Sequence, residues 1–190
     1  MNAILSLLWE TLTKNNVCLY YLLGICPLLL YNLNLGESFI TGLVIILLMV
    51  LGNWVVFIIE KIFLLPLGLS YMQISFFVLI IYLLLYYSKI MVKRLPGNLS
   101  DLFDNYPEFF FTNYAIYGVI FLNRSSNLPF WETTVASFGF GFGYLVILVL
   151  FMLIKEKMNI NERMPIPVFR QLLILSLMSL VFMSLIFKQR

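Results

Sequence analysis

Long apolar runs alternate with short polar stretches along the chain and divide it into six segments. A helix needs about 20 mainly apolar residues to cross the hydrocarbon core of a bilayer. The segments cover roughly residues 3–30, 39–59, 71–92, 99–122, 130–154 and 168–187. The pattern predicts an all-α integral membrane protein with six transmembrane helices.

The first segment contains polar and helix-breaking residues where an unbroken helix would have none. They are Glu10, Lys14, Asn15, Asn16, Gly24 and Pro27. Backbone without helical hydrogen bonds persists at membrane depth only where it is buried in protein or lines a cavity. We therefore predict a first helix that is broken into half-helices, and expect Pro27 to end the piece that carries Cys26.

The fourth segment has the same character. Residues 99–108 are too polar to face lipid, and the strongly apolar part covers 109–122, with Asn113 near its start. A compromised first half, an Asn and then an apolar half-helix repeat the order seen in the first segment. The fourth helix is therefore also predicted to be broken.

The two breaks occupy equivalent places in an internal duplication. Asn16 lies 44 residues before Glu60, Asn113 lies 43 residues before Glu156, and a Lys follows each Glu. Such a repeat in a membrane chain indicates two three-helix halves with a site where they meet. The halves of this single transmembrane domain, residues 1–190, cover approximately residues 1–95 and 96–190.

Composition supports lipid as the solvent and excludes several kinds of site. Hydrophobic residues make up 62% of the chain, charged residues 11%, and the mean hydropathy is +0.99, whereas soluble domains are about 25% charged. The absence of His excludes His-metal sites and His-based catalytic triads. No basic run with interleaved aromatic residues is present, so a nucleic-acid partner is not expected.

Basic residues predict the orientation, because cytoplasmic loops carry an excess of Lys and Arg. With six alternating spans, the loops after the third and fifth spans share one face and hold Lys89, Lys93, Arg94, Lys155, Lys157, Arg163 and Arg170. The opposite face holds Lys61, Arg124, Lys188 and Arg190. Seven against four predicts both termini on the non-cytoplasmic side.

Two cysteines are the candidate metal ligands. Cys26 lies between Gly24 and Pro27, so the end of a half-helix would present its thiolate to a metal; the alternative is a small buried hydrophobe, as most unpaired Cys are. Cys18 lies about 2.2 helical turns earlier, on a different face, where the buried-hydrophobe interpretation is stronger. We expect the Cys26 sulfur to point to the junction of the two half-helices.

Three further groups of residues carry open alternatives. Asn15, Asn16 and Asn113 are expected either to cap freed backbone at the breaks or to line a polar pathway. The glycines at 139, 141 and 143 neither follow a strand nor open a soluble helix, so close helix–helix approach is favoured over a nucleotide loop. The acidic residues Asp101, Asp104 and Glu108 are expected to form either a cation entrance or a solvated loop.

The order and spacing of five motifs resemble a known family. They are N-N-x-x-L-x-x-x-L-G-I-C-P at 15–27, I-F-L-L-P-L-x-L-x-Y-x-x-x-x-x-F at 62–77, T-N-x-A-I-x-G-V-x-x-L-N at 112–123, V-L-F-x-x-I-K-E-K at 149–157 and L-M-S-L-V-F-M at 177–183. Over nearly its full length the chain resembles the RnfA subunits of Rnf ion-translocating electron-transport complexes and the homologous NqrE subunits of the sodium-pumping quinone reductase.

The resemblance implies a fold, partners and a cofactor. It implies six helices in two inverted halves, in a bacterial plasma (inner) membrane with both termini outside. It also implies pairing with an oppositely oriented RnfE-like or NqrD-like subunit, each member supplying two Cys to a shared [2Fe-2S] cluster. Other partners would carry flavin and iron–sulfur groups, and the complex would couple electron transfer to Na⁺ or H⁺ movement. Such a membrane subunit is not catalytic alone.

One position departs from the family pattern. Cys26 stands at the first ligand position, whereas Tyr114 stands at the second, directly after Thr112-Asn113. Two interpretations follow: the cluster is retained with an altered ligand set, or this member has lost it. On the first interpretation Cys26 and Tyr114 bind the cluster, while Gly24, Pro27, Asn16 and Asn113 support the half-helix ends.

Two interpretations of other classes compete with the electron-relay subunit. Substrate-binding membrane subunits of vitamin or metal transporters also have six helices in about 190 residues, but many carry A-x-x-x-A in the first helix, where this chain has only Ala3. The other is a purely structural subunit that has lost its redox centre, which Tyr114 would explain.

Overall fold

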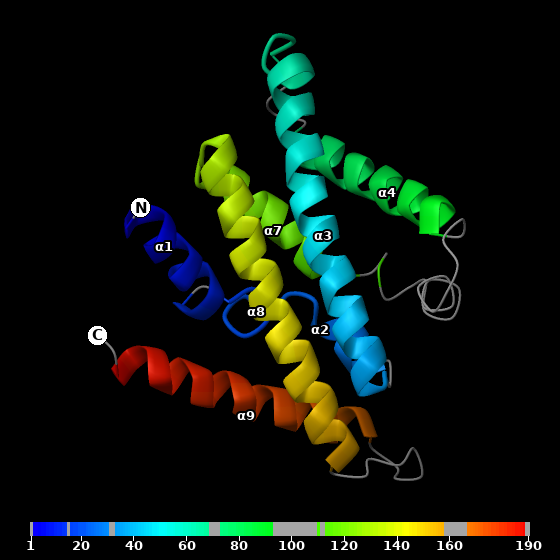
Figure 1. Ribbon diagram of the computed structural model, residues 1–190, viewed down its shortest axis with the longest axis vertical. Coiled ribbons are helices and arrows are strands. Elements are labelled where there is room, and N and C mark those ends of the chain that lie inside the picture. The colour runs from blue at the N-terminus through cyan, green and yellow to red at the C-terminus, as the bar shows by residue number, and fades with distance from the viewer. Residues whose placement is uncertain are drawn as a thin grey trace.

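The computed structural model describes residues 2–14, 16–30, 33–68, 73–92, 110, 113–157 and 167–188, and within them every regular element is a helix (Figure 1). The elements are α1 (Asn2–Trp9), the π-helical turn η1 (Glu10–Lys14), α2 (Ile25–Leu30), α3 (Leu35–Ile59), the π-helical turn η2 (Glu60–Leu64), α4 (Gln73–Val92), α7 (Tyr114–Ser125), α8 (Phe130–Lys157) and α9 (Pro167–Lys188). The predicted all-α class is confirmed for these residues.

Helices α3 and α8 form the centre of the molecule, and α7 packs against both (Figure 1). Glycines allow the close approach. A Cβ on Gly42 of α3 would meet Leu145 of α8 at 2.8 Å, and a Cβ on Gly141 of α8 would meet Ile46 at 2.9 Å. The large side chains Leu48 and Met49 of α3 and Tyr144 and Phe151 of α8 are fully buried.

The glycine-rich part of α8 also receives the N-terminal half of the first segment. Gly139 lies against Thr11, and a Cβ on Gly143 would meet Asn16 Nδ2 at 2.6 Å. Between these glycines, Phe138 and Phe142 point outward and are each 50% exposed. The glycines thus bring helix backbones together, as the sequence predicted.

This packing predicts that alanine at Gly139 lowers the stability of the protein, whereas alanine at Gly36 does not. Gly139→Ala places a methyl group against the Thr11 side chain and near Leu8 O. We expect this overpacking to lower the free energy of unfolding by roughly 1–3 kcal/mol, and so to lower the midpoint of thermal unfolding in detergent. Gly36→Ala is the control, because nothing lies within 4 Å of its added Cβ. Equal midpoints for the two variants would contradict the α1–η1–α8 contact.

Two of the described helices are long and apolar enough to cross a membrane. They are the continuous Leu35–Leu64, made of α3 and η2, and Phe130–Lys157. Shorter apolar helical stretches occur at Ser75–Ile90 and Gln171–Val181. The second segment was expected to end at Glu60. Instead the helix continues through η2 (Glu60–Leu64), and Glu60 is buried within the protein. The six-span arrangement in two halves stays a prediction.

Large apolar side chains cover the outside of the shorter helices. On α4, Val78, Leu79 and Tyr82 are 50–53% exposed, and on α9 Leu180 and Val181 are 66% and 60% exposed. Exposed apolar surface of this extent is typical of a lipid or partner contact rather than of a water-facing surface.

Candidate functional site

The first helix is broken between η1 and α2, where residues 16–24 form turns instead of helix. Asn16 is 2% exposed, and its Oδ1 accepts hydrogen bonds from the backbone N–H groups of Cys18 (2.9 Å) and Leu19 (3.2 Å). Its Nδ2 donates to Leu12 O at 3.3 Å. One buried side chain thus satisfies a backbone carbonyl before the break and two backbone N–H groups within it, which would be costly to leave unpaired away from water.

The second break has an Asn in the same local role. Asn113 is fully buried and precedes α7 as its N-cap, and its Oδ1 accepts a hydrogen bond from Ala115 N–H at 3.1 Å. Asn16 and Asn113 therefore both accept from the amide two residues later. This shared geometry agrees with the equivalent places of the two residues in the sequence repeat. Asn15 lies outside the described residues.

Tyr144 of α8 joins the two breaks. Its hydroxyl accepts a hydrogen bond from Asn113 Nδ2 at 3.1 Å and donates one to Gly24 O at 3.2 Å. Gly24 has φ +77°, and an added Cβ there would lie 2.7 Å from Ala115 Cβ, Asn113 Oδ1 and Tyr144 Cε2. Gly24 therefore satisfies both a left-handed backbone and a close approach. The two broken helices meet at this point.

Beside this junction, Cys26 and Tyr114 stand at the beginnings of the half-helices. Both side chains are exposed, Tyr114 by 59%. The exposure of Cys26 does not fit the alternative of a small buried hydrophobe, and the direction of its sulfur toward the junction stays a prediction. Cys18, in contrast, is completely buried, as expected. Cys26 is exposed and therefore available to a neighbouring molecule, whereas the space beside Gly24 is filled by Tyr144, Asn113 and Ala115.

Pro27 has a different structural role from the one expected. It lies in the first turn of α2 (Ile25–Leu30) and so begins the half-helix that carries Cys26 instead of ending it. The first-turn N–H groups of a helix have no intrahelical acceptor, so a Pro there loses no hydrogen bond. At the other end of α2, the buried Lys155 of α8 donates from Nζ to Leu29 O at 3.4 Å, which places a cation at the C-terminal end of the helix.

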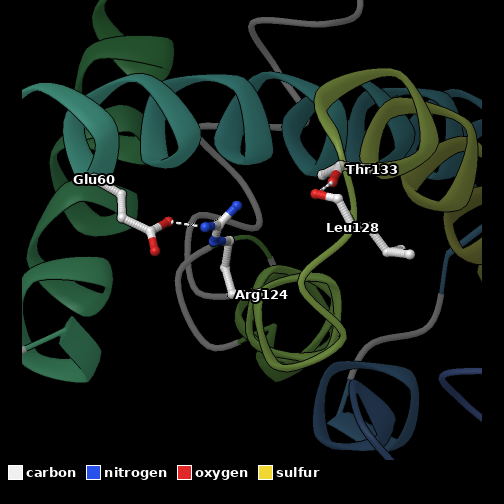
Figure 2. Close-up of polar contacts among 4 residues, drawn as sticks. All are labelled: Glu60, Arg124, Leu128 and Thr133. Carbon is white, nitrogen blue, oxygen red and sulfur yellow. Dashed lines mark hydrogen bonds and ion pairs between the residues drawn. The ribbon is translucent and has the colours of Figure 1, made fainter. Parts of the chain in front are cut away.

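A second buried polar region joins α3, α7 and α8. Asn123 Nδ2 donates to Asn53 Oδ1 (3.1 Å) and to Ser137 Oγ (3.0 Å). At the next residue of α7, Arg124 forms an ion pair with Glu60, and the two side chains point toward each other from α7 and η2 (Figure 2). The Arg124 guanidinium also lies 5.2 Å from the centre of the Phe57 ring.

The sequence contains only a weak signal for this region. Glu60 directly follows one apolar run and Arg124 lies two residues after another, so both are predicted as charges at the ends of spans, and only their opposite signs suggest a pair. The acidic residues at 101, 104 and 108 lie outside the described residues.

In the connection from α7 into α8, Thr133 Oγ1 donates a hydrogen bond to Leu128 O at 3.2 Å (Figure 2).

A metal site needs ligands that come together. Among the residues that the structure describes, no group of three or more His, Cys, Asp or Glu side chains is placed to hold a metal ion. An iron–sulfur cluster takes four ligands, usually thiolates. Cys26 and Tyr114 could supply at most part of such a set.

Together these features define a helical membrane protein whose helices are interrupted at residues 16–24 and at Asn113, with Tyr144 hydrogen-bonded to both interruptions. The profile of the family described as "Rnf-Nqr subunit, membrane protein" matches residues 4–188. The chain belongs to this Rnf-Nqr family and is embedded in a membrane.

Curated relatives agree over almost the whole chain. The chain is similar to the A subunit of the ion-translocating oxidoreductase complex of Pectobacterium atrosepticum, with 30% identity over 91% of this chain and 91% of the relative. The protein of the same name from Yersinia pestis is 29% identical over 97% and 96%. That from Vibrio cholerae serotype O1 El Tor Inaba is 28% identical over 97% and 96%.

Proposed function

We propose that this chain is an integral membrane subunit of an ion-translocating oxidoreductase complex of the Rnf/Nqr type. In this proposal it relays electrons across a bacterial plasma (inner) membrane through an iron–sulfur centre shared with a homologous, oppositely oriented subunit of the RnfE or NqrD kind. The electron transfer is coupled to Na⁺ or H⁺ transport. The chain itself has six spans in two inverted halves, with both termini outside.

The observation that carries the proposal is the contact between the two helix breaks. Tyr144 hydrogen-bonds both of them, and each break is followed by a half-helix with an exposed candidate ligand in its first turn. Exposed side chains beside a filled junction are suited to a group bound between two subunits. A group enclosed within this chain alone would need buried ligands.

The donor atoms of this chain suit half of a shared centre. Cys26 would supply a thiolate, and Tyr114 would supply a phenolic oxygen where the family pattern has a second Cys. When bound, such a centre supplies one-electron transfer. The chain's own contribution is positional: Asn16 and Asn113 hold the freed backbone, and Tyr144 holds the two half-helix beginnings together. The remaining ligands would come from the partner subunit.

The test is electron paramagnetic resonance (EPR) of the purified, reduced complex, together with its iron content. In the proposal, Cys26→Ala removes the reduced cluster signal and lowers iron per complex. Cys18→Ala is the matched control: it also removes one thiol, but a fully buried one, so the signal remains. A cluster signal unchanged in Cys26→Ala and carried by the intact complex would rule out Cys26 as a ligand.

A further inference from the structure

The half-helix α2, which carries Cys26, is too short to fix its own position. It has six residues, and the first four N–H and last four C=O groups of any helix have no partner inside it. Pro27 and Leu28 are buried, whereas Cys26 is exposed. The helix packs against α8 and α9 (Figure 1). The place of Cys26 is therefore determined by the contacts that α2 makes with other helices.

Two side chains of α8 bind the backbone of this segment at its two ends. At the beginning, the Tyr144 hydroxyl donates to Gly24 O, directly before α2, at 3.2 Å. At the end, Lys155 Nζ donates to Leu29 O at 3.4 Å. Leu29 lies in the last turn of α2, where a carbonyl has no intrahelical donor. Both contacts thus satisfy backbone oxygens that the short helix cannot satisfy itself.

The two contacts come from one face of one helix. Lys155 follows Tyr144 by 11 residues, which is about three turns of an α-helix, so both side chains leave α8 in nearly the same direction. Helix α8 is continuous over 28 residues and lies at the centre of the molecule, against α3. A single central helix therefore holds both ends of α2.

The burial of Lys155 distinguishes it from its neighbours in the K-E-K sequence at 155–157. Lys155 is 7% exposed, whereas Glu156 and Lys157 are exposed. A Lys that only marks the end of a membrane span extends its ammonium group toward water. The Lys155 ammonium instead lies inside the protein, at Leu29 O and 5.9 Å from the centre of the Phe151 ring. Its position indicates a structural contact with α2.

We propose that Lys155 is a positioning residue for Cys26, and that together with Tyr144 it holds α2 so that the thiol stays beside the junction. Leu29 lies three residues after Cys26, and residues three apart are neighbours on a helix. A change at Leu29 O therefore reaches Cys26 directly. The inference rests on the proposed function, in which Cys26 is a ligand of a centre shared with a partner subunit.

The experiment records the continuous-wave EPR spectrum of a nitroxide label on Cys26, in the full chain with Cys18→Ala, in detergent and below the thermal midpoints of all variants. Lys155→Met removes the ammonium donor and keeps an apolar stem, so we expect the label to rotate several-fold faster. Lys155→Arg keeps a positively charged donor and should restore most of the immobilisation. Lys157→Met is the matched control, because it removes one positive charge from an exposed position of the same helix, and its spectrum should equal that of the parent.

A second label separates a local effect from a general loss of structure. Leu79 lies on α4 and is 53% exposed, so Leu79→Cys in a chain without Cys18 and Cys26 carries the label away from α2. We expect Lys155→Met to leave the mobility of this label unchanged. Equal loosening of both labels would assign Lys155 to the whole fold and overturn the proposal. Identical Cys26 spectra in Lys155→Met and Lys157→Met, or no recovery in Lys155→Arg, would also overturn it.

The outcome is separable from that of the electron-relay proposal, because the label experiment needs no iron. A faster label in Lys155→Met, with a cluster signal that survives Cys26→Ala, would keep the role of Lys155 in holding α2 and reject Cys26 as a ligand. A cluster signal lost in Cys26→Ala, with an unchanged label in Lys155→Met, would do the reverse.

Discussion

Arg124→Met is expected to destabilise the protein by about 3 kcal/mol, because it leaves the Glu60 carboxylate buried without its ion-pair partner. The two side chains are only 15% and 8% exposed, so water can replace the guanidinium only in part. Removing the second charge should reverse most of the loss. We therefore expect Glu60→Gln combined with Arg124→Met to unfold at a higher temperature than Arg124→Met alone.

Thermal midpoints at one scan rate, in the same detergent, provide the measurement. Lys61→Met is the control, because Lys61 is the exposed neighbour of Glu60 and its replacement also removes one positive charge. If Arg124→Met and Lys61→Met had the same midpoint, the ion pair would contribute nothing to stability, and its place in the buried polar region would have to be reconsidered.

Gly24→Ala is expected to cost roughly 2–4 kcal/mol, from two sources that a second glycine separates. An alanine in the left-handed region costs about 1–2 kcal/mol, and Gly24 has φ +77°. Its added methyl group would also overlap Asn113, Ala115 and Tyr144, each 2.7 Å from the Cβ position, and overpacking costs about 1–3 kcal/mol.

Gly68→Ala carries the first cost without the second. Gly68 has φ +66°, but nothing lies within 4 Å of its added Cβ. The difference between the two thermal midpoints therefore reports the contact between the helix breaks. Equal losses in Gly24→Ala and Gly68→Ala would mean that the first break does not pack against the second.

Local sequence patterns predicted the elements well. Continuous apolar runs of the second, third, fifth and sixth segments became helices, because lipid-exposed backbone has to satisfy its hydrogen bonds internally. The breaks were visible because Asn16, Gly24 and Asn113 interrupt apolar runs with polar or flexible residues. The close packing at Gly139 and Gly143 followed from their spacing, since residues four apart share one helix face.

Features that depend on distant partners were not visible. Tyr144 lies in an ordinary apolar helix, and its importance comes from Gly24 and Asn113, which are far away in the sequence. The role of Pro27 depended on which side of it the half-helix formed. The exposure of Cys26 depends on how α2 packs against the rest of the chain, which no local pattern of the sequence reveals.

The central claim is that the two breaks meet, with residues 26 and 114 beside the meeting point. Gly24 contacts Ala115, and residues 26 and 114 lie two and one residues from that contact, so their Cα atoms are within roughly 18 Å. Spin labels on Cys26 and on Tyr114→Cys, in a Cys18→Ala background, measure this distance in the full chain. We predict strong dipolar coupling in the doubly labelled protein. A spectrum equal to the sum of the two singly labelled spectra, with no coupling at short range, would contradict the claim.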